Sequence, residues 1–270
     1  MTLTRPTFLK LGGSIITDKS RPFTARHDVV ARYAEEIGQA LEANPGLRLL
    51  LGHGSGSFGH WAAKPYGTRH GVGTPEEWRG YAAVAGAAAR LNRLVTDALL
   101  EADVPVLTIQ PSASARCRDG LLYHLETHPL RAGLACGLNP LVYGDVALDD
   151  VRGGTIISTE EIFVYLAREL KPARILLIGR APGVLDEEGQ VIPRIRPADL
   201  PHLQDALKGS AGVDVTGGMA DKVTQMVHLA QQQEAVTIHI LSCDSPGDLT
   251  RALLDPTIEI GTRIVAQSAG

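Results

Sequence analysis

Two glycine-rich segments, each directly after a short apolar run, contain residues suited to binding an anion. They are Lys10-Leu11-Gly12-Gly13-Ser14 and Gly52-His53-Gly54-Ser55-Gly56-Ser57-Phe58-Gly59-His60. Glycine lets the backbone approach a charged group closely, because no Cβ stands in the way. Successive amide N–H groups can then surround a phosphate, often with a helix N-terminus behind them. One such segment could be only a tight turn, but two at strand ends predict a ligand site at one edge of a sheet.

A third glycine cluster lies in the second half of the chain, before a predicted helix. It runs Asp214-Val215-Thr216-Gly217-Gly218-Met219 and is followed by Lys222. The amides at a helix start and the helix macrodipole favour an anion there. Lys222 adds a cation about one turn further on. The cluster predicts a second phosphate-binding geometry, although an ordinary capped helix with a solvated lysine would show the same residues.

Better-known nucleotide motifs do not explain these segments. Gly54 to Gly59 matches G-x-G-x-x-G, but it follows the second predicted strand rather than the first. The next acidic residues, Glu76 and Glu77, open a helix instead of ending a strand, so a dinucleotide site is disfavoured. The sequence also contains no G-x-x-x-x-G-K-[ST] and no protein-kinase H-R-D or D-F-G set.

The elements that must position these residues alternate between strands and helices. Apolar runs predict strands over residues 7–11, 47–51, 104–109, 174–178 and 236–241. Helical spacing predicts helices over residues 27–43, 75–102, 159–170, 217–232 and 245–254, and hairpins are expected over 141–157 and 183–192. This alternation predicts an α/β fold, with an open, mostly parallel sheet between two layers of helices. A weak boundary at Lys171-Pro172 predicts two halves, residues 1–171 and 172–270, on one continuous sheet.

Composition excludes several classes of protein. The chain has 270 residues, 44% of them apolar, which is enough for a buried core. Its 26 Lys and Arg against 30 Asp and Glu give a net charge of −4, which argues against a nucleic-acid partner but permits a local basic pocket. No apolar run reaches the ~18 residues of a membrane span, and no signal peptide is evident. Three widely spaced cysteines without a CxxC pair are typical of reduced thiols. We expect a soluble cytoplasmic protein with no membrane partner.

Taken in order, the three glycine clusters and Lys222 resemble the amino acid kinase family, and the resemblance covers most of the chain. It implies an αβα fold in which residues 1–171 bind the phosphoryl acceptor and residues 172–270 bind ATP. It also implies Mg²⁺ as a cofactor and a homodimer as the assembly, and it assigns no protein residue as a metal ligand.

The resemblance also implies roles for individual residues. By position, Lys10, Lys19 and His60 are expected to be catalytic. ATP is expected to contact Lys10, Leu11, Gly12, Gly13, Ser14, Gly56, Gly179, Gly183, Thr216, Gly217, Gly218 and Lys222. The acceptor is expected to contact Gly54, Ser55, Gly59, His60 and Thr159.

Within the family, four features are similar to the branch that phosphorylates isopentenyl phosphate to isopentenyl diphosphate in isoprenoid biosynthesis. They are Lys19, Ser57-Phe58-Gly59-His60, Ile109-Gln110-Pro111-Ser112 and Tyr143-Gly144-Asp145. The small residues at 78–89 could leave space for an isoprenyl chain or serve only close helix packing. A fosfomycin-type or other phosphonate kinase could use the same His60 site, whereas a carboxylate kinase would not need it. A non-catalytic nucleotide sensor is the remaining alternative.

Two segments depart from the family's usual pattern. Ser158-Thr159-Glu160-Glu161 replaces Ser-Gly-Asp-Asp, and Gly179-Arg180-Ala181-Pro182-Gly183-Val184 replaces Thr-Asp-Val-Asp-Gly-Val. A phosphate monoester needs no general base to attack, because its second pKa is about 6. We therefore expect Glu160 to orient lysines or water near Mg²⁺ and Glu161 to be helical surface. His53 is expected to pack at a strand end, and His124 and His128 to lie in a surface loop.

Overall fold

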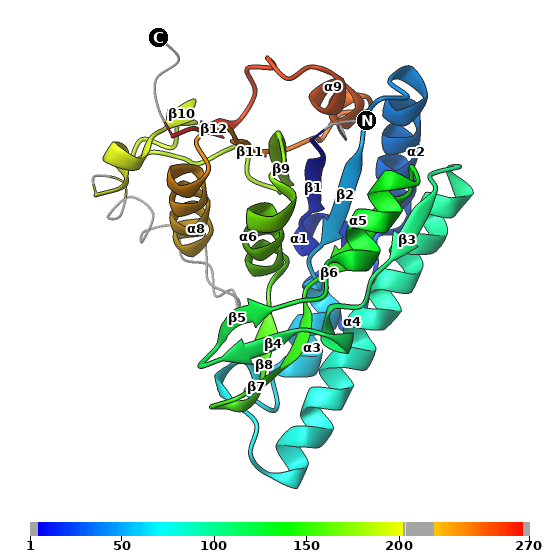
Figure 1. Ribbon diagram of the computed structural model, residues 1–270, viewed down its shortest axis with the longest axis vertical. Helices are drawn as coiled ribbons and strands as arrows, with labels where there is room; N and C mark the ends of the chain where they lie inside the picture. Colours follow the sequence, from blue (N-terminus) through cyan, green and yellow to red (C-terminus); the bar gives the residue numbers. More distant parts are fainter. Residues whose placement is uncertain (1–4, 202, 204–218, 267–270) are drawn as a thin grey trace.

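An eight-stranded sheet forms the centre of the fold in the computed structural model, which describes residues 5–201, 203 and 219–266 (Figure 1). Its strand order is β10-β12-β11-β9-β1-β2-β6-β3, and the paired strands are parallel except for β11 with β12. The strands are β1 (Thr7–Leu11), β2 (Leu49–His53), β3 (Val106–Thr108), β6 (Asn139–Tyr143), β9 (Arg174–Ile178), β10 (Arg194–Ile195), β11 (Thr237–Leu241) and β12 (Thr262–Ile264).

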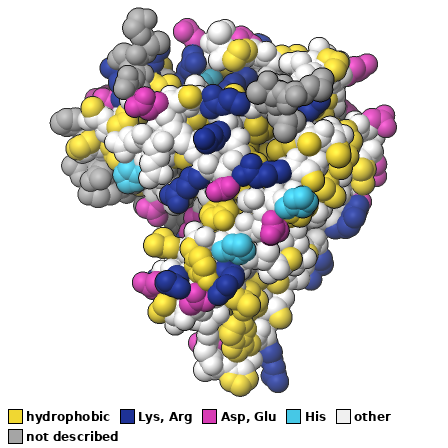
Figure 2. Space-filling model, viewed as in Figure 1, with side chains coloured by type: hydrophobic (Ala, Val, Ile, Leu, Met, Phe, Trp, Pro, Cys, Tyr) yellow, Lys and Arg dark blue, Asp and Glu magenta, His cyan; other side chains and the backbone are white. Residues whose placement is uncertain are grey.

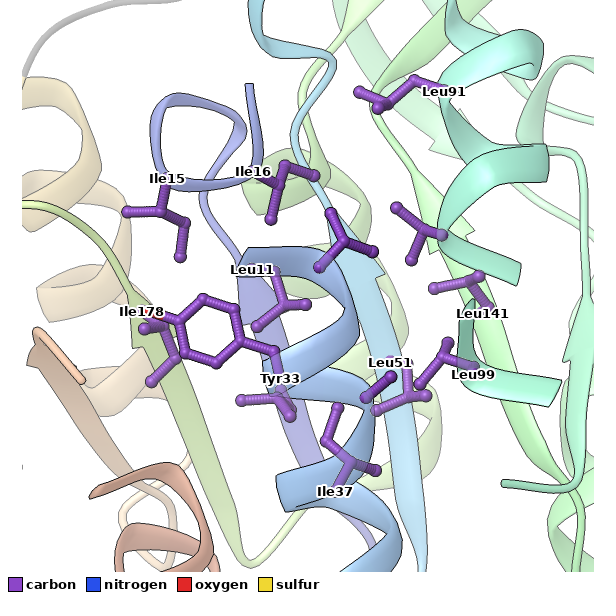
Figure 3. Close-up of a cluster of buried hydrophobic side chains, with 14 of the residues drawn as sticks. Leu11, Ile15, Ile16, Tyr33, Ile37, Leu51, Leu91, Leu99, Leu141 and Ile178 are labelled. Carbon is purple, nitrogen blue, oxygen red and sulfur yellow. The ribbon is translucent and has the colours of Figure 1, made fainter. Parts of the chain in front are cut away.

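Helices cover both faces of this sheet, because successive residues of a strand point to opposite sides. Leu9 and Leu11 of β1 join one hydrophobic cluster, whereas Phe8 joins the other. The first cluster, drawn in Figure 3, packs against α2 (His27–Ala43), α4 (Pro75–Glu101) and α9 (Asp248–Leu254). The second packs against α5 (His128–Ala135), α6 (Thr159–Leu170) and α8 (Met219–Gln232). The predicted α/β fold, with helices on both faces of a mostly parallel sheet, is therefore confirmed.

Two helices, α4 and α6, begin at capping boxes. Thr74 and Glu77 form a capping box at the start of α4, with Pro75 at the first helical position. Ser158 and Glu161 form a second capping box at the start of α6. Shorter helical segments are α1 (Gly13–Ile16), α3 (Gly56–Ala63), η1 (Thr68–His70), η2 (Pro111–Ala113) and η3 (Pro197–Asp199).

A second sheet, with strand order β5-β4-β7-β8, lies beyond the carboxyl ends of the central strands (Figure 1). Its strands are β4 (Arg116–Arg118), β5 (Leu121–His124), β7 (Asp145–Asp149) and β8 (Gly153–Ile157). Only Gly144 separates β6 from β7, and only Ser158 separates β8 from α6. The second sheet therefore interrupts the alternation of strand and helix along the chain. It lies at the same edge of the central sheet as the two glycine segments, which follow β1 and β2.

Several local expectations were wrong. Residues 104–109 form only the short, half-buried edge strand β3, and the apolar run from Leu141 to Val146 is divided at Gly144 between two sheets. His128 starts helix α5 rather than lying in a loop, and the second glycine segment becomes helix α3 at Gly56. The hairpin expected over residues 183–192 is reduced to one bridge between Leu185 and Val191.

Figure 2 shows Lys and Arg side chains gathered near the middle of the face in view, with acidic side chains scattered around them. None of the helices in the described ranges combines the length and apolar character needed to cross a membrane.

His239, in the middle of β11, makes the stability of this fold dependent on pH. It is fully buried, and neither ring nitrogen has a hydrogen-bond partner among the described residues. Burial, followed by the positive charges of Arg263 and Arg174, lowers its pKa from 6.5 to about 4. The unfolded chain therefore binds more protons than the folded protein between these two pH values, and the free energy of unfolding falls as pH falls through this window.

Replacing His239 with leucine is expected to reduce this pH dependence by up to about 1.4 kcal/mol per pH unit, the value for one proton. Urea unfolding at several pH values between about 4 and 7 measures the slope. His228→Gln, on the exposed side of α8, is the matched control and should keep the wild-type slope. An unchanged slope in His239→Leu would contradict the assignment.

Candidate active site

A cavity of about 250 Å³ lies at the carboxyl ends of β1, β2 and β9, next to the second sheet. The starts of α3, α6 and α8 also reach it, so several helix N-termini border one space. The residues with predicted roles that line it are Lys10, Gly12, Gly13, Ser14, Lys19, Gly54, Ser55, Gly56, Gly59, His60, Thr159, Gly179 and Lys222. Residues from most of the chain therefore meet at the predicted edge of the sheet.

The two glycine segments pack backbone against backbone. A Cβ built on Gly13 would lie 2.7 Å from the Cα of Gly56, and one built on Gly54 would lie 2.8 Å from the amide nitrogen of Gly13. Gly56 itself has a φ of +51°, a conformation that favours glycine. Thr17 links the segments further: its hydroxyl donates to Gly13 O at 2.6 Å and accepts from the Ser57 amide at 2.9 Å. The close approach fixes the position of one segment relative to the other.

Glu160 lies between two lysines that come from different elements. Its Oε1 pairs with Lys10 Nζ, and the same oxygen lies 3.5 Å from Lys222 Nζ. Glu160 and Lys10 are buried, whereas Lys222 is half-buried. Burial by itself would raise the pKa of Glu160, but Lys10 and then Lys222 bring it down to about 2. Glu160 is thus ionised at neutral pH and orients both lysines, as expected.

Glu161 is a structural partner and not the helical surface that was expected. One of its carboxylate oxygens accepts from the Ser158 amide in the α6 capping box. Its carboxylate also accepts two hydrogen bonds from Arg69, at 2.7 and 3.0 Å. Glutamate is the usual acidic residue at this capping position, which gives the departure from Asp a local physical reason. These contacts, with the 2.6 Å bond from Thr159 Oγ1 to His53 O, hold the start of α6 and hence Glu160 in place.

His53 is buried at the end of β2 and does not line the cavity. Its ring is fully buried, stacks on Tyr143 with ring centroids 5.5 Å apart, and bonds to Asn92 Oδ1 at 3.2 Å. Burial lowers its pKa to about 4, so the ring is neutral at pH 7. This agrees with the expected packing role at the end of β2.

Part of the cavity lining is apolar. It includes Ala63 of α3, three residues after His60, Val84 and Ala88 of α4, and Ile156 of β8. The small residues of α4 thus border the cavity, and the same run also packs closely, since a Cβ on Gly80 would overlap Tyr66. Asp145 also lines the cavity; burial raises its pKa although it accepts hydrogen bonds from the amides of Ser112 and Val146.

Some predicted site residues lie elsewhere. Leu11 is part of the first hydrophobic cluster, and Gly183 packs against Val191 and Thr262 rather than lining the cavity. Thr216, Gly217 and Gly218 lie outside the described residues. Conversely, Arg180, Ala181, Met219 and Gln225 line the cavity without having been assigned a contact. For Arg180 and Ala181 the signal was available, because they directly follow the end of β9.

Comparison with known proteins gives a consistent result. The sequence profile described as "Amino acid kinase family" matches residues 5–242. The isopentenyl phosphate kinase of Methanothermobacter thermautotrophicus is 35% identical over 270 residues, covering 96% of this chain and 98% of the relative. That of Haloferax volcanii is 38% identical over 248 residues, covering 90% and 97%.

Solved structures agree with these sequence relatives. A structure titled "X-ray structures of isopentenyl phosphate kinase" superposes with a TM-score of 0.80 at 31% identity, covering 96% of this chain and 99% of the other. An N-acetylglutamate synthase from Neisseria gonorrhoeae shares the fold alone, with a TM-score of 0.67 at 16% identity over 98% of this chain and 62% of the other. The chain belongs to the amino acid kinase family.

Proposed function

We propose that this protein transfers the terminal phosphoryl group of ATP to isopentenyl phosphate, which yields isopentenyl diphosphate. The observation that carries the proposal is a single cavity lined by two unlike kinds of group. Glycine backbone, lysines and His60 line it, and so do Ala63, Val84 and Ile156, which belong to one cluster of buried hydrophobic side chains. A small molecule with a phosphate at one end and a short branched hydrocarbon at the other fits both. The relatives named isopentenyl phosphate kinase support the same choice.

On this proposal, the acceptor phosphate lies at the start of α3. Ser55, Gly56, Gly59 and His60 line the cavity there, and a helix N-terminus attracts an anion. The His60 imidazole adds a side-chain donor, which forms a stronger hydrogen bond to phosphate when it is protonated. The hydrocarbon chain would contact Val84, Ala88 and Ile156.

ATP would take the part of the cavity bordered by β9 and α8. Gly12, Gly13 and Ser14 supply backbone near the phosphates, and Lys222 supplies a cation. A Mg²⁺ ion held by the ATP phosphates would neutralise phosphate charge there.

The residues present match the needs of phosphoryl transfer between two anions. A phosphate monoester has its second pKa near about 6, so its attacking oxygen is already largely ionised at neutral pH. Glu160, with a pKa of about 2, is too weak a base to remove a proton efficiently, and none has to be removed. Lys10, Lys19 and Lys222 reduce the repulsion between the two phosphates, and a unit charge pair at ~4 Å contributes roughly 4 kcal/mol at an effective dielectric constant of about 20.

The division into an acceptor half and an ATP half, the homodimer and the cytoplasmic location stay predictions.

A kinase assay with ATP and Mg²⁺ tests the proposal directly. Isopentenyl phosphate, dimethylallyl phosphate, fosfomycin and N-acetylglutamate are compared as acceptors, and the highest kcat/KM is expected for isopentenyl phosphate. Higher kcat/KM with fosfomycin would favour a phosphonate kinase, and with N-acetylglutamate a carboxylate kinase. ATP binding without turnover of any acceptor would indicate a nucleotide sensor.

His60→Ala is expected to lower kcat/KM for isopentenyl phosphate by about tenfold to a few hundredfold, the effect of losing one charge-assisted hydrogen bond. ATP binding measured without acceptor should be nearly unchanged, and His60→Gln should retain more activity than His60→Ala. His70→Ala, an exposed histidine outside this cavity, is the control. Unaltered acceptor kinetics in His60→Ala would remove His60 from the site.

Glu160→Gln is expected to lower kcat by less than about a thousandfold, roughly 4 kcal/mol, because the carboxylate orients lysines and accepts no proton. The pH profile of kcat should keep its shape, since no titrating base is removed. The exposed Glu76→Gln, in the first turn of α4, is the matched control. A larger loss, accompanied by a changed pH profile, would assign Glu160 as a general base after all.

A further inference from the structure

Arg180 lines the cavity, and the proposed mechanism gives it no role. It follows Gly179 at the carboxyl end of β9, the strand paired with β1. The Nε of Arg180 donates a hydrogen bond to the Ser14 carbonyl oxygen at 3.0 Å. Arg180 therefore lies against the first glycine segment, where the two halves of the sheet meet.

Arg180 differs from Lys10 and Lys222 because its guanidinium does not pair with Glu160. Glu160 contacts both Lys10 and Lys222. Arg180 is exposed to the cavity, and within the described residues its terminal Nη nitrogens form no ion pair or hydrogen bond. A guanidinium has five N–H donors, and the bond to Ser14 uses the one on Nε.

We propose that Arg180 binds the phosphate chain of ATP through its Nη nitrogens. The inference rests on the proposed function only in taking ATP as the nucleotide. A planar guanidinium donates two parallel hydrogen bonds to phosphate oxygens, which gives stronger and more directional binding than an ammonium group. The bond to Ser14 holds the guanidinium beside the first glycine segment, to which the proposed function assigns the ATP phosphates.

The acceptor is a poorer candidate for this contact. His60, Val84 and Ala88 belong to α3 and α4, which contact one another, whereas Arg180 extends from β9 on the far side of β1 from β2.

Binding of ATP, ADP and adenosine, measured by calorimetry without any acceptor, tests the assignment. Arg180→Ala should weaken binding of ATP and ADP by about tenfold to a hundredfold and leave adenosine binding unchanged. Arg180→Lys should recover only part of the loss, because it keeps the charge but loses the bidentate geometry. Arg93→Ala, which removes an exposed arginine paired with Asp97 on α4, should match the wild type in every measurement.

Two results would overturn the proposal. Wild-type ATP affinity in Arg180→Ala would show that the guanidinium does not touch the phosphates. An equal loss of adenosine affinity, with lowered thermal stability, would show that Arg180 only braces the Ser14 segment. The acceptor assay separates this proposal from the proposed function: a wild type that binds ATP but does not phosphorylate isopentenyl phosphate refutes the function and not the Arg180 contact.

Discussion

A buried carboxylate shared by two lysines is the contact on which the arrangement of the cavity depends. Lys10 belongs to β1 and Lys222 to α8, and two ammonium groups this close would repel each other without Glu160 between them. Removing one member of such a buried group leaves uncompensated charge, which is strongly destabilising. These three residues therefore join β1, α6 and α8 into one unit. It places positive charge where two anionic substrates have to approach each other.

The second sheet contributes apolar side chains to the cavity lining through Ile156 and Ile157 of β8. Its strands β7 and β8, which lie between β6 and α6 in sequence, bring Ile156 to the cavity three residues before Thr159. Polar and apolar recognition thus come from adjacent positions in sequence. The close backbone contact between Gly13 and Gly56 complements this arrangement, because it fixes the position of one glycine segment relative to the other.

Elements with strong local patterns could be predicted from the sequence. β1, β9, α2 and α6 have the predicted bounds, because continuous apolar runs and helical spacing specify them without distant partners. The β4–β5 hairpin could not be predicted, since strands of three or four residues such as Arg116–Arg118 are too short to show a period. The role of Glu161 was missed for a related reason: its partner Arg69 lies 92 residues away, and no local pattern links them.

The contacts of Arg69 decide which wall of the cavity can be redesigned. The same guanidinium that binds Glu161 also donates to the carbonyl oxygen of Ile156. A substitution at Ile156 that shifts the backbone of β8 would therefore also disturb Arg69 and the α6 cap. The disturbance would extend to Glu160 and its two lysines. Val84 and Ala88 lie on the long helix α4, whose backbone is held by its own hydrogen bonds. Libraries aimed at longer or more branched substrates are better concentrated on that helix, where side-chain volume can change without altering the contacts of Lys10, Glu160 and Lys222.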